Sequence, residues 1–538
     1  MAGLAKAFGS GAMTNTIEDL AEADVILAIG TNTTEAHPII GYQMKKAVRE
    51  RGAKIIVADP RRIPLVDFAE IWLAQRPGTD VALLNGLMNV ILSEGLADRD
   101  FIAERTEGFA ELEVVLPKYT PDVVGKITGV AAEDIRQAAR LYANAGRAAI
   151  CYTMGITQHT SGTDNVLAIA NLAMITGNLG KRGAGVNPLR GQNNVQGACD
   201  MGGLPNVLTA YQPVADEAVR EKFEKAWGVE LSPNPGLTLS EVTKKAGEGE
   251  IKALYIMGEN PALSDPDSTH VKEALEKLDF LVVQDIFLTE TAELADVVLP
   301  SACFAEKDGT FTNSERRVQR VRKATEPPGE AKPDWRIIAE IGLALRYPMH
   351  YESAEEIYEE MRKLTPSYAG ISYERLEKGG LHWPCPTEEH PGTPILHTQG
   401  FTRGKGLFHA VDHRAPAEEA DEEYPMILTT GRSLWQYHTG TMTRRSEALN
   451  SLAPRSWVEM HPADAAKHGI ADGEDVVLTS RRGCLTSTAM VTEGIREGVI
   501  FMPFHYAESA ANVLTNTAID PVAKIPELKV CAVKMAKA

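Results

Sequence analysis

Short apolar runs recur along the chain and predict the strands of two similar repeats. The runs are ADVILAIGTN (23–32), KIIVADPRR (54–62) and FAEIWLA (68–74) in the first repeat, and IKALYIMGEN (251–260), FLVVQDIF (280–287) and LADVVLP (294–300) in the second. None of them alternates strictly between apolar and polar residues, which is typical of parallel strands covered on both faces. Because helical stretches separate the strands, we expect two related αβα modules, each with a parallel sheet.

Polar residues follow the predicted strands at matching places in both repeats. They are Gly30, Thr31, Asn32 and Asp59 in the first repeat, and Gly258, Glu259, Asn260 and Asp285 in the second. Ligands bind beyond the carboxyl ends of parallel strands, so the two sets predict two similar ligand sites, with each Asp accepting hydrogen bonds from a ribose or a guanine edge. The alternative is that the Asp residues cap turns and the Gly residues end strands. Neither repeat carries GxGxxG, which argues against a standard nicotinamide site.

The pattern changes at about Lys405, where short β-runs begin. These runs are YPMILTTGR, EDVVLTSRRG, LTSTAMVTE and GVIFMPFHY, and their spacing predicts a small β-barrel. Residues 414–423 are acidic and predict a solvated linker, and residues 461–476 predict a short helix that ends at Gly469. We therefore expect three domains: 1–192, an incomplete second module with connecting helices at 193–404, and 405–538.

One polar segment, Gly177–Gly203, stands out as a candidate site. It is too rich in Gly and Asn to predict a helix. Apart from Arg182 near its start, the segment has one Arg, Arg190. This residue lies among amide side chains at Asn187, Gln192, Asn193, Asn194 and Gln196. Glycines allow close backbone approach to a ligand, and a guanidinium among amides is suited to holding a carboxylate. The alternative is a long Gly/Asn-rich surface loop.

Composition narrows the class of protein. A chain of 538 residues is long enough for several domains. Its net charge of −18 argues against nucleic acid as the main partner, although one buried Arg can still attract a small anion. No apolar stretch is long enough to span a membrane. The six cysteines include no CxxC pair, which suits a reducing compartment and argues against zinc or iron–sulfur ligation by these residues.

The segment Gly177–Gly203 closely resembles the active-site segment of molybdenum- or tungsten-dependent formate dehydrogenase catalytic subunits. These enzymes belong to the bis-molybdopterin-guanine-dinucleotide (DMSO reductase) family, and the resemblance covers nearly the whole chain. It implies an α/β fold with two related Rossmann-like αβα modules and a C-terminal double-psi β-barrel domain. It also implies a bis-molybdopterin guanine dinucleotide cofactor with Mo or W, and a catalytic role for Arg190 in orienting formate beside the metal.

The resemblance further implies a set of cofactor-binding residues. These are Gly30, Asn32, His37, Asp59, Gly78, Asp80, Gly155, Gln158, Gly191, Gln192, Gly258, Glu259, Asn260, Gln284, Asp285, Thr289, Gly431, Arg432, Tyr437, His438, Thr439, Thr441, Asn512 and Lys529. We expect Asp80 to cap an amphipathic helix, and Arg316 and Arg317 to form surface or interdomain salt bridges. For His438 two roles remain, a proton relay or, with more weight, a simple cofactor contact.

Complete members of the family begin with a domain for one [4Fe–4S] cluster, followed by a Cys or selenocysteine that ligates the metal. None of these ligands is present, so no metal ligand is assigned here. The family segment V-A-G-L follows the metal ligand closely, and this chain opens M-A-G-L. We therefore expect that a selenocysteine codon was taken for a stop codon, so that the sequence was assigned a start downstream of it. The alternative is a gene fragment or a split subunit. In either case the second repeat should leave part of its core open.

The implied reaction converts formate to CO2, two electrons and one proton, and can also run in reverse. The implied partner is an electron-transfer subunit of iron–sulfur, diaphorase or hydrogenase type, with a cytoplasmic location unless an export signal lies in the missing part. Two alternatives remain. One is another enzyme of the family, such as a nitrate or polysulfide reductase. The other is a cofactor-free structural relative, like the large iron–sulfur subunit of respiratory complex I.

Overall fold

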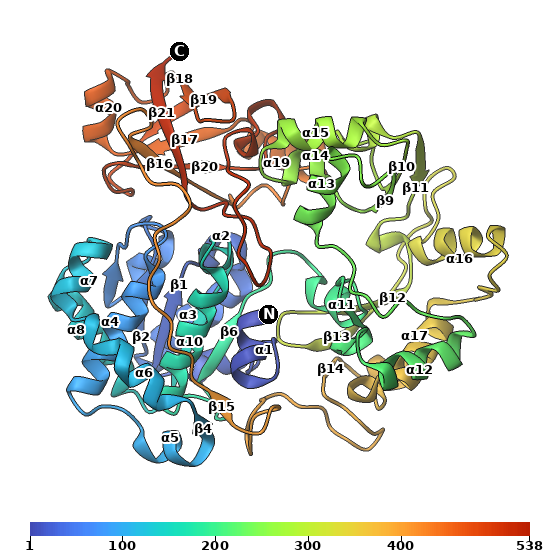
Figure 1. Cartoon of the computed structure of the whole chain (residues 1–538), viewed down its shortest axis with the longest axis horizontal. Helices are drawn as coiled ribbons and strands as arrows, with labels where there is room; N and C mark the ends of the chain where they lie inside the picture. The colour runs from blue at the N-terminus through green and yellow to red at the C-terminus, as the bar shows by residue number, and fades with distance from the viewer. The chain divides into compact units, whose positions relative to one another are not determined.

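The computed structural model describes all 538 residues, and the chain forms two compact units (Figure 1). The first unit comprises residues 1–191, 264–268 and 395–538, and the second comprises 192–263 and 269–394. The first unit is therefore assembled from both ends of the chain. None of the helices combines the length and the apolar character that crossing a membrane requires.

A five-stranded parallel sheet, here called the first sheet, forms the centre of the first unit. Its strand order is β3-β2-β1-β5-β6. The strands are β1 (Val25–Ile29), β2 (Lys54–Ala58), β3 (Ile71–Leu73), β5 (Ala148–Tyr152) and β6 (Gly185–Pro188). The chain runs outward from β1 to β3 and then crosses back to β5. The carboxyl ends of β1 and β5 therefore form a topological switch point, where open α/β sheets bind ligands.

Helices cover both faces of the first sheet. Alternate strand residues such as Leu27 and Ile56 pack against α4 (Asp80–Ser93), α8 (Ala132–Ala143) and α10 (Gly162–Ile175). The intervening residues, such as Ile26 and Val57, pack against α3 (Pro38–Arg51) on the other face. Double coverage explains why these strands are continuous apolar runs in the sequence.

A three-stranded parallel sheet in the second unit, here called the second sheet, is covered on one face only. Its order is β11-β10-β9, with β9 (Ala253–Met257), β10 (Phe280–Asp285) and β11 (Val297–Pro300). Helix α15 (Ser268–Glu276) packs on Leu281 and Val283. The opposite face exposes 43% of Tyr255, 48% of Met257, 46% of Phe280 and 37% of Val297.

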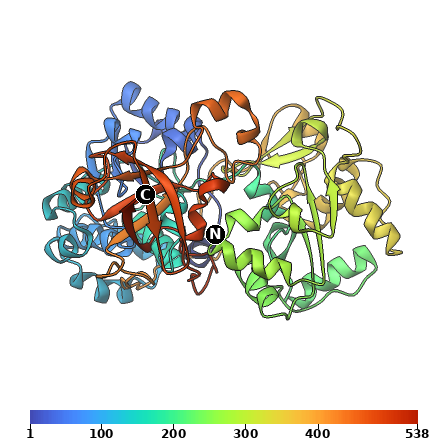
Figure 2. The same cartoon turned by 90° about the horizontal axis from the view of Figure 1, so that it is seen from above.

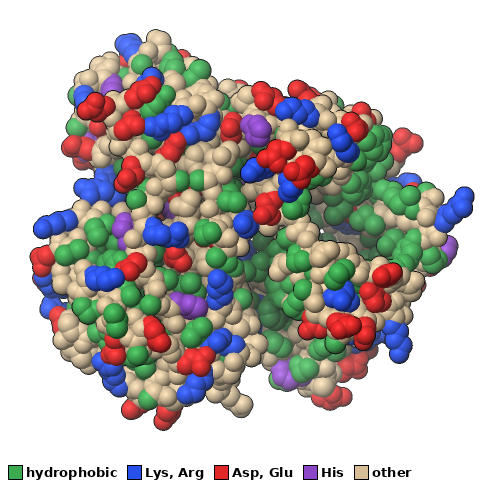
Figure 3. All heavy atoms as spheres, in the orientation of Figure 1, with side chains coloured by type: hydrophobic (Ala, Val, Ile, Leu, Met, Phe, Trp, Pro, Cys, Tyr) green, Lys and Arg blue, Asp and Glu red, His purple; other side chains and the backbone are tan.

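Hydrophobic side chains are visible over the region of β10 and β11 in the space-filling view (Figure 3). Register places Phe280 opposite Ala253 and Val297 opposite Val282, so the exposed apolar residues share one face. The expectation that the second repeat leaves part of its core open is therefore confirmed for this face.

The predicted C-terminal barrel is present as six strands in a closed ring, ordered β16-β20-β17-β19-β18-β21. The strands are β16 (Met426–Gly431), β17 (Trp457–Met460), β18 (Asp475–Thr479), β19 (Cys484–Val491), β20 (Val499–Pro503) and β21 (Cys531–Lys537). Figure 2 shows them in orange and red. The Arg61 guanidinium, just beyond β2, donates to both carboxylate oxygens of Glu459 in β17 at 2.6 and 2.9 Å. The barrel thus lies over the carboxyl ends of the first sheet.

Two local predictions about helices were wrong. The segment Gly177–Gly203 is not entirely loop, because it contains β6 and the short helix α11 (Val195–Asp200). Asp80 is not an N-cap: Thr79 precedes α4, and Asp80 is its first residue, accepting from the Gln75 amide at 3.0 Å. Helix α4 is also buried nearly all round rather than amphipathic, because it is packed between α8 and α10. In contrast, α20 (Pro462–His468) ends at Gly469 as predicted.

Two predictions about charged segments also need correction. Arg316 is fully buried and donates to the backbone carbonyls of Thr393 at 2.8 Å and Pro394 at 2.9 Å, so it forms no surface salt bridge. The acidic stretch 414–423 is not merely solvated. Its Glu418 lies against Arg482, whose Nη2 is 3.0 Å from the carboxylate, and accepts the Ala532 backbone N–H at 3.0 Å. Through these contacts Glu418 holds the acidic stretch against the barrel.

Candidate functional site

Two glycines form the floor of the switch point on the first sheet. Gly30 follows β1 with a φ of +55°, and a Cβ there would lie 2.8 Å from the carbonyl carbon of Gly155, which follows β5. The Thr153 hydroxyl donates to the Gly30 carbonyl at 2.8 Å. The loops after β1 and β5 therefore meet backbone to backbone, a contact that only glycine allows.

Buried polar atoms without a hydrogen-bond partner lie at or just beyond the carboxyl ends of β1, β5 and β6. They are Thr31 Oγ1, Thr34 Oγ1, Tyr152 OH, and both amide atoms of Asn187. Asn187 is completely buried in β6. Native proteins rarely leave buried polar atoms unpaired, because each costs about 1–3 kcal/mol. This arrangement is expected of a crevice built to receive a polar ligand.

The backbone around Arg190 is held from two sides. The Arg190 carbonyl accepts a hydrogen bond from His37 Nε2 at 2.6 Å, and the Gly191 carbonyl accepts one from Arg432 Nη1 at 2.6 Å. The Arg190 guanidinium lies 3.4 Å from the Gly11 carbonyl. His37 comes from the first module and Arg432 from the barrel. The candidate catalytic residue is therefore fixed where these two parts of the first unit meet.

A second histidine cluster organises the loop after β16. His505 Nε2 accepts the Ser433 backbone N–H at 2.9 Å, and its Nδ1 lies against the His438 carbonyl. His438 has a φ of +49°. Burial, aided by the nearby Arg432 charge, lowers the pKa of His438 to about 4. Its imidazole is therefore neutral at physiological pH.

Acidic and basic groups face each other in this enclosed region. Burial raises the pKa of Asp59, at the end of β2, to about 6, although part of its surface stays accessible. Burial and the Arg432 charge lower the pKa of Lys529 to about 7, and Lys529 donates to the Thr430 carbonyl at 2.6 Å. Burial therefore shifts each group toward its neutral form. Burial likewise raises the pKa of Asp80 to about 6.

The corresponding polar residues of the second sheet are bonded within the second unit. Gln284 is buried and donates to Asp334 at 2.7 Å. The Asn260 amide donates to Glu290 at 2.8 Å and accepts from Thr291 Oγ1 at 2.7 Å. Asp285 accepts the Ile286 N–H at 2.6 Å, as the turn-capping alternative predicts. Their hydrogen-bonding capacity is largely used internally.

The sequence-predicted site residues therefore fall into two groups. The first unit holds Gly30, Asn32, His37, Asp59, Gly78, Asp80, Gly155, Gln158, Arg190, Gly191, Gly431, Arg432, Tyr437, His438, Thr439, Thr441, Asn512 and Lys529. The second unit holds Gln192, Gly258, Glu259, Asn260, Gln284, Asp285 and Thr289. Within the first group, Thr439 and Thr441 hydroxyls lie 3.0 Å apart, and Asn512 donates to the Ser264 carbonyl at 2.8 Å.

Sequence reasoning missed one buried histidine, His159, and gave little weight to another, His505, at the end of a predicted strand. His159 donates from Nε2 to the Gly155 carbonyl at 2.9 Å and lies 3.9 Å from the Asp80 carboxylate, with its Nδ1 unpartnered. His505 links two parts of the loop after β16. His159 directly follows the predicted contact Gln158, so its position after a strand was the available clue. Nothing local marks His505, because its partners lie far away in the sequence.

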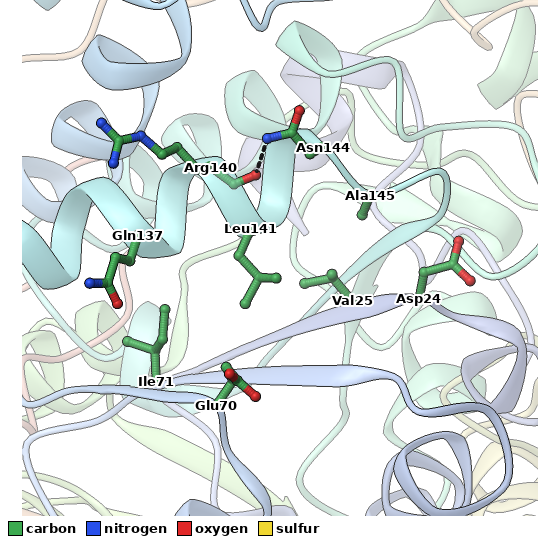
Figure 4. Close-up of a pocket in the computed structure, with 9 residues that line it drawn as sticks. All are labelled: Asp24, Val25, Glu70, Ile71, Gln137, Arg140, Leu141, Asn144 and Ala145. Atoms are coloured by element: carbon green, nitrogen blue, oxygen red, sulfur yellow. Dashed lines mark hydrogen bonds between the residues drawn. The ribbon is translucent and has the colours of Figure 1, made fainter.

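A separate groove of about 580 Å³ opens at the other end of the first sheet (Figure 4). It is lined by residues at the starts of β1 and β3 and on α8, including Asp24, Glu70 and Arg140. Arg140 makes a two-point contact with Glu94 at 2.8 and 2.9 Å, and Lys54 pairs with Glu70 at 2.6 Å. Its charges are already neutralised, and it lies away from the glycine floor.

Comparison with known proteins identifies two matching family models. The model described as "Molybdopterin oxidoreductase" matches residues 3–343, and that described as "Molydopterin dinucleotide binding domain" matches residues 426–532. The second match coincides with the barrel. Among solved structures, acetylene hydratase from Pelobacter acetylenicus has a TM-score of 0.80 at 22% identity, covering 100% of this chain and 80% of that one. That likeness supports the fold alone.

Several curated relatives align with almost the whole chain. The F420-dependent formate dehydrogenase subunit alpha of Methanocaldococcus jannaschii is 56% identical, over 99% of this chain and 79% of its own length. Formate dehydrogenase H of Escherichia coli is 44% identical, over 99% and 76%. The assimilatory nitrate reductase catalytic subunit of Bacillus subtilis is 39% identical, over 97% and 76%.

Proposed function

The chain belongs to the molybdopterin oxidoreductase family, and we propose that within it the chain is the alpha subunit of a formate dehydrogenase, oxidising formate to CO2. The single observation that carries this function is the 56% identity, over 99% of this chain and 79% of the relative, to a formate dehydrogenase alpha subunit. It is supported by Arg190, whose backbone is held by His37 and Arg432 near the carboxyl ends of the first sheet.

The residues at the switch point fit the dinucleotide that the family implies. The unpartnered atoms of Thr31, Tyr152 and Asn187 can satisfy polar edges of such a ligand, and the Gly30–Gly155 floor allows close approach. We propose that one arm of a bis-molybdopterin guanine dinucleotide lies here and under the loop after β16. When bound, the cofactor with its Mo or W supplies the two-electron redox centre.

Arg190 is proposed to bind the formate carboxylate. A guanidinium offers two parallel N–H donors to the two oxygens of a carboxylate, which fixes orientation as well as position. Because His37 and Arg432 hold the neighbouring carbonyls, little backbone freedom is left to lose when formate binds. The neutral state of His438, with a pKa of about 4, favours a hydrogen-bonding contact with the cofactor over proton relay at neutral pH.

The second arm is proposed to lie at the second sheet, near Gly258, Glu259 and Asp285. Support comes from the repeat in sequence and from the open space at Gly258, where an added Cβ would meet no atom within 4 Å. The fit is weaker than in the first unit, because Asn260 and Gln284 already have internal partners.

Further elements are proposed from the family resemblance. Relatives are alpha subunits, so partner subunits are implied, and we propose one of iron–sulfur, diaphorase or hydrogenase type. The chain spans 79% of the length of these relatives. A [4Fe–4S] cluster and the Cys or selenocysteine metal ligand are proposed for the remainder. The three-domain division at 192 and 404 is retained as a proposal, with a double-psi arrangement for the barrel.

The test is a substrate comparison on the native enzyme purified from its source. Formate oxidation is measured with a viologen dye, coenzyme F420 and NAD as acceptors, and nitrate reduction with reduced viologen. Formate turnover without nitrate turnover supports the proposal. Nitrate turnover without formate turnover assigns the chain to the reductase class, to which a relative at 39% identity belongs.

A further inference from the structure

His505 is buried where two neighbouring parallel strands of the barrel end. Strands β16 and β20 pair so that Gly431 lies opposite Pro503. Two residues beyond these ends come Ser433 and His505. The His505 side chain is only 1% exposed, so its ring faces the interior and not the solvent.

The hydrogen bonds of His505 define one tautomer. A backbone N–H can only donate, so Nε2, which takes the Ser433 N–H at 2.9 Å, carries no proton. The proton is therefore on Nδ1, which donates to the His438 carbonyl. Burial lowers the pKa of His505 to about 4, so the ring keeps this neutral form at physiological pH.

These two bonds close the loop of residues 432–441, here called the Arg432 loop, around one imidazole. Gly440 has a φ of +73°, and a Cβ there would lie 2.7 Å from the His505 carbonyl oxygen. The ring of Phe504 meets the ring of His438 edge to face at 5.7 Å. The loop is therefore wrapped closely on residues 504–505.

The Arg432 loop reaches the candidate catalytic segment through its first residue. Arg432 directly precedes Ser433, and its Nη1 donates to the Gly191 carbonyl at 2.6 Å. A Cβ on Gly191 would lie 2.9 Å from Arg432 Nη2, so the contact is tight. Displacement of Ser433 therefore displaces Arg432 and releases one of the two carbonyl contacts beside Arg190.

We propose that His505 is a positioning residue, which holds Ser433 so that Arg432 can fix the backbone of Arg190 for substrate binding. The expected effect on formate binding rests on the proposed formate dehydrogenase function, whereas the expected effect on the backbone at Arg190 does not. His505 touches neither substrate nor reacting atoms in this role. It acts through Arg432.

The structural test is hydrogen–deuterium exchange, followed by mass spectrometry, on the full chain without cofactor. In His505→Ala, exchange should accelerate about tenfold or more in peptides covering the Arg432 loop, and also in peptides covering 188–192. His461→Ala is the control for loss of a histidine that accepts a backbone N–H elsewhere in the barrel domain. His461 Nδ1 accepts the Ala463 N–H at 3.2 Å in the same barrel, and its loss should affect only the start of α20.

Two conservative variants separate positioning from general packing. The amide oxygen of Gln in His505→Gln can reach the place of Nε2 and accept from Ser433. The amide nitrogen of Asn in His505→Asn can reach the place of Nδ1 and donate to the His438 carbonyl. The proposal expects His505→Gln, and not His505→Asn, to restore slow exchange at 188–192.

Kinetics of the loaded enzyme give the second readout. His505→Asn should raise the formate KM by about fivefold or more with a smaller change in kcat, and His505→Gln should remain near wild type. Acceleration confined to the Arg432 loop, or equal behaviour of the two variants, overturns the proposal. If the wild-type enzyme does not oxidise formate but the exchange pattern is as expected, the positioning role of His505 is supported and the formate dehydrogenase function is contradicted. If His505→Ala does not fold, the Gln and Asn pair decides.

Discussion

The two parallel sheets arise from similar sequence runs but differ in what their surfaces do. The first sheet is buried on both faces and leaves polar atoms unpaired at its carboxyl ends. The second has one exposed apolar face, and its polar strand ends are bonded internally. Burial of both faces stabilises the first sheet and offsets the cost of leaving polar atoms unpaired for a ligand. The second sheet buries only one face, and its polar groups instead contribute hydrogen bonds to its own stability.

The largest expected difference is in packing. Ile29 ends β1 with no exposure, and Met257 occupies the matching position in β9 with 48% exposed. Ile29→Ala should lower the free energy of unfolding by about 2–5 kcal/mol through lost burial and a cavity. Met257→Ala should change it by less than about 0.5 kcal/mol. Urea unfolding of both variants checks this, and equal losses would mean that the second sheet is covered in solution.

The polar strand ends should respond in opposite ways. Asn260→Ala removes the bonds to Thr291 and Glu290 and should lower stability by about 1–3 kcal/mol. Asn187→Ala removes an amide that has no partner, so the cofactor-free chain should be as stable or more stable. Thermal unfolding measures both. Pterin content should fall in Asn187→Ala, and a destabilised Asn187→Ala would contradict the proposed ligand contact.

Arg190 tests whether the first unit carries substrate binding. Arg190→Lys keeps the charge but loses the paired donors, so the formate KM should rise about tenfold or more while metal content stays intact. Steady-state kinetics and metal analysis of the full-length enzyme provide the measurements. A matched control is Arg140→Lys, because Arg140 lies at the opposite end of the same sheet and pairs with Glu94. Normal formate kinetics in Arg190→Lys would contradict the proposed role of Arg190 in binding formate.

A further contrast concerns pH. The folded-state pKa of Lys529 is about 7, below its ordinary value of 10.5, so between these values the unfolded chain binds more protons than the folded chain. Stability contributed at this site therefore rises with pH across that window, by up to ~1.4 kcal/mol per pH unit. Lys529→Met abolishes this rise. Its advantage in melting temperature over wild type should be greatest at pH 7 and shrink toward pH 10, whereas a constant difference would contradict the lowered pKa.

Sequence alone revealed the elements that leave a local pattern. The strands of both repeats, the barrel and the helix ending at Gly469 follow from apolar runs and turn residues. The open face of the second sheet leaves no such mark in hydropathy, since Tyr255 and Met257 are as apolar as buried residues. Its exposure was expected only from the family resemblance.

The candidate site likewise contains residues that a local sequence pattern reveals and residues that it does not. Arg190 stood out because a lone guanidinium among amides is locally unusual. The role of His505 depends on Ser433 and His438, which are distant in sequence and brought together by strand pairing. The cap at Asp80 was misplaced by one residue, which local preference cannot resolve when Thr and Asp are adjacent.

The discontinuity of the first unit has a consequence during synthesis. Its N-terminal part ends at Gly191 and, apart from the short piece 264–268, the unit resumes only at Ile395, so the ribosome must complete the whole of 192–394 in between. At about 5–20 residues per second, this interval lasts roughly 10–40 s. Throughout it the nascent N-terminal sheet lacks the barrel that covers its ligand end. The order of translation therefore leaves the carboxyl ends of the first sheet uncovered for a period before the C-terminal strands close over them.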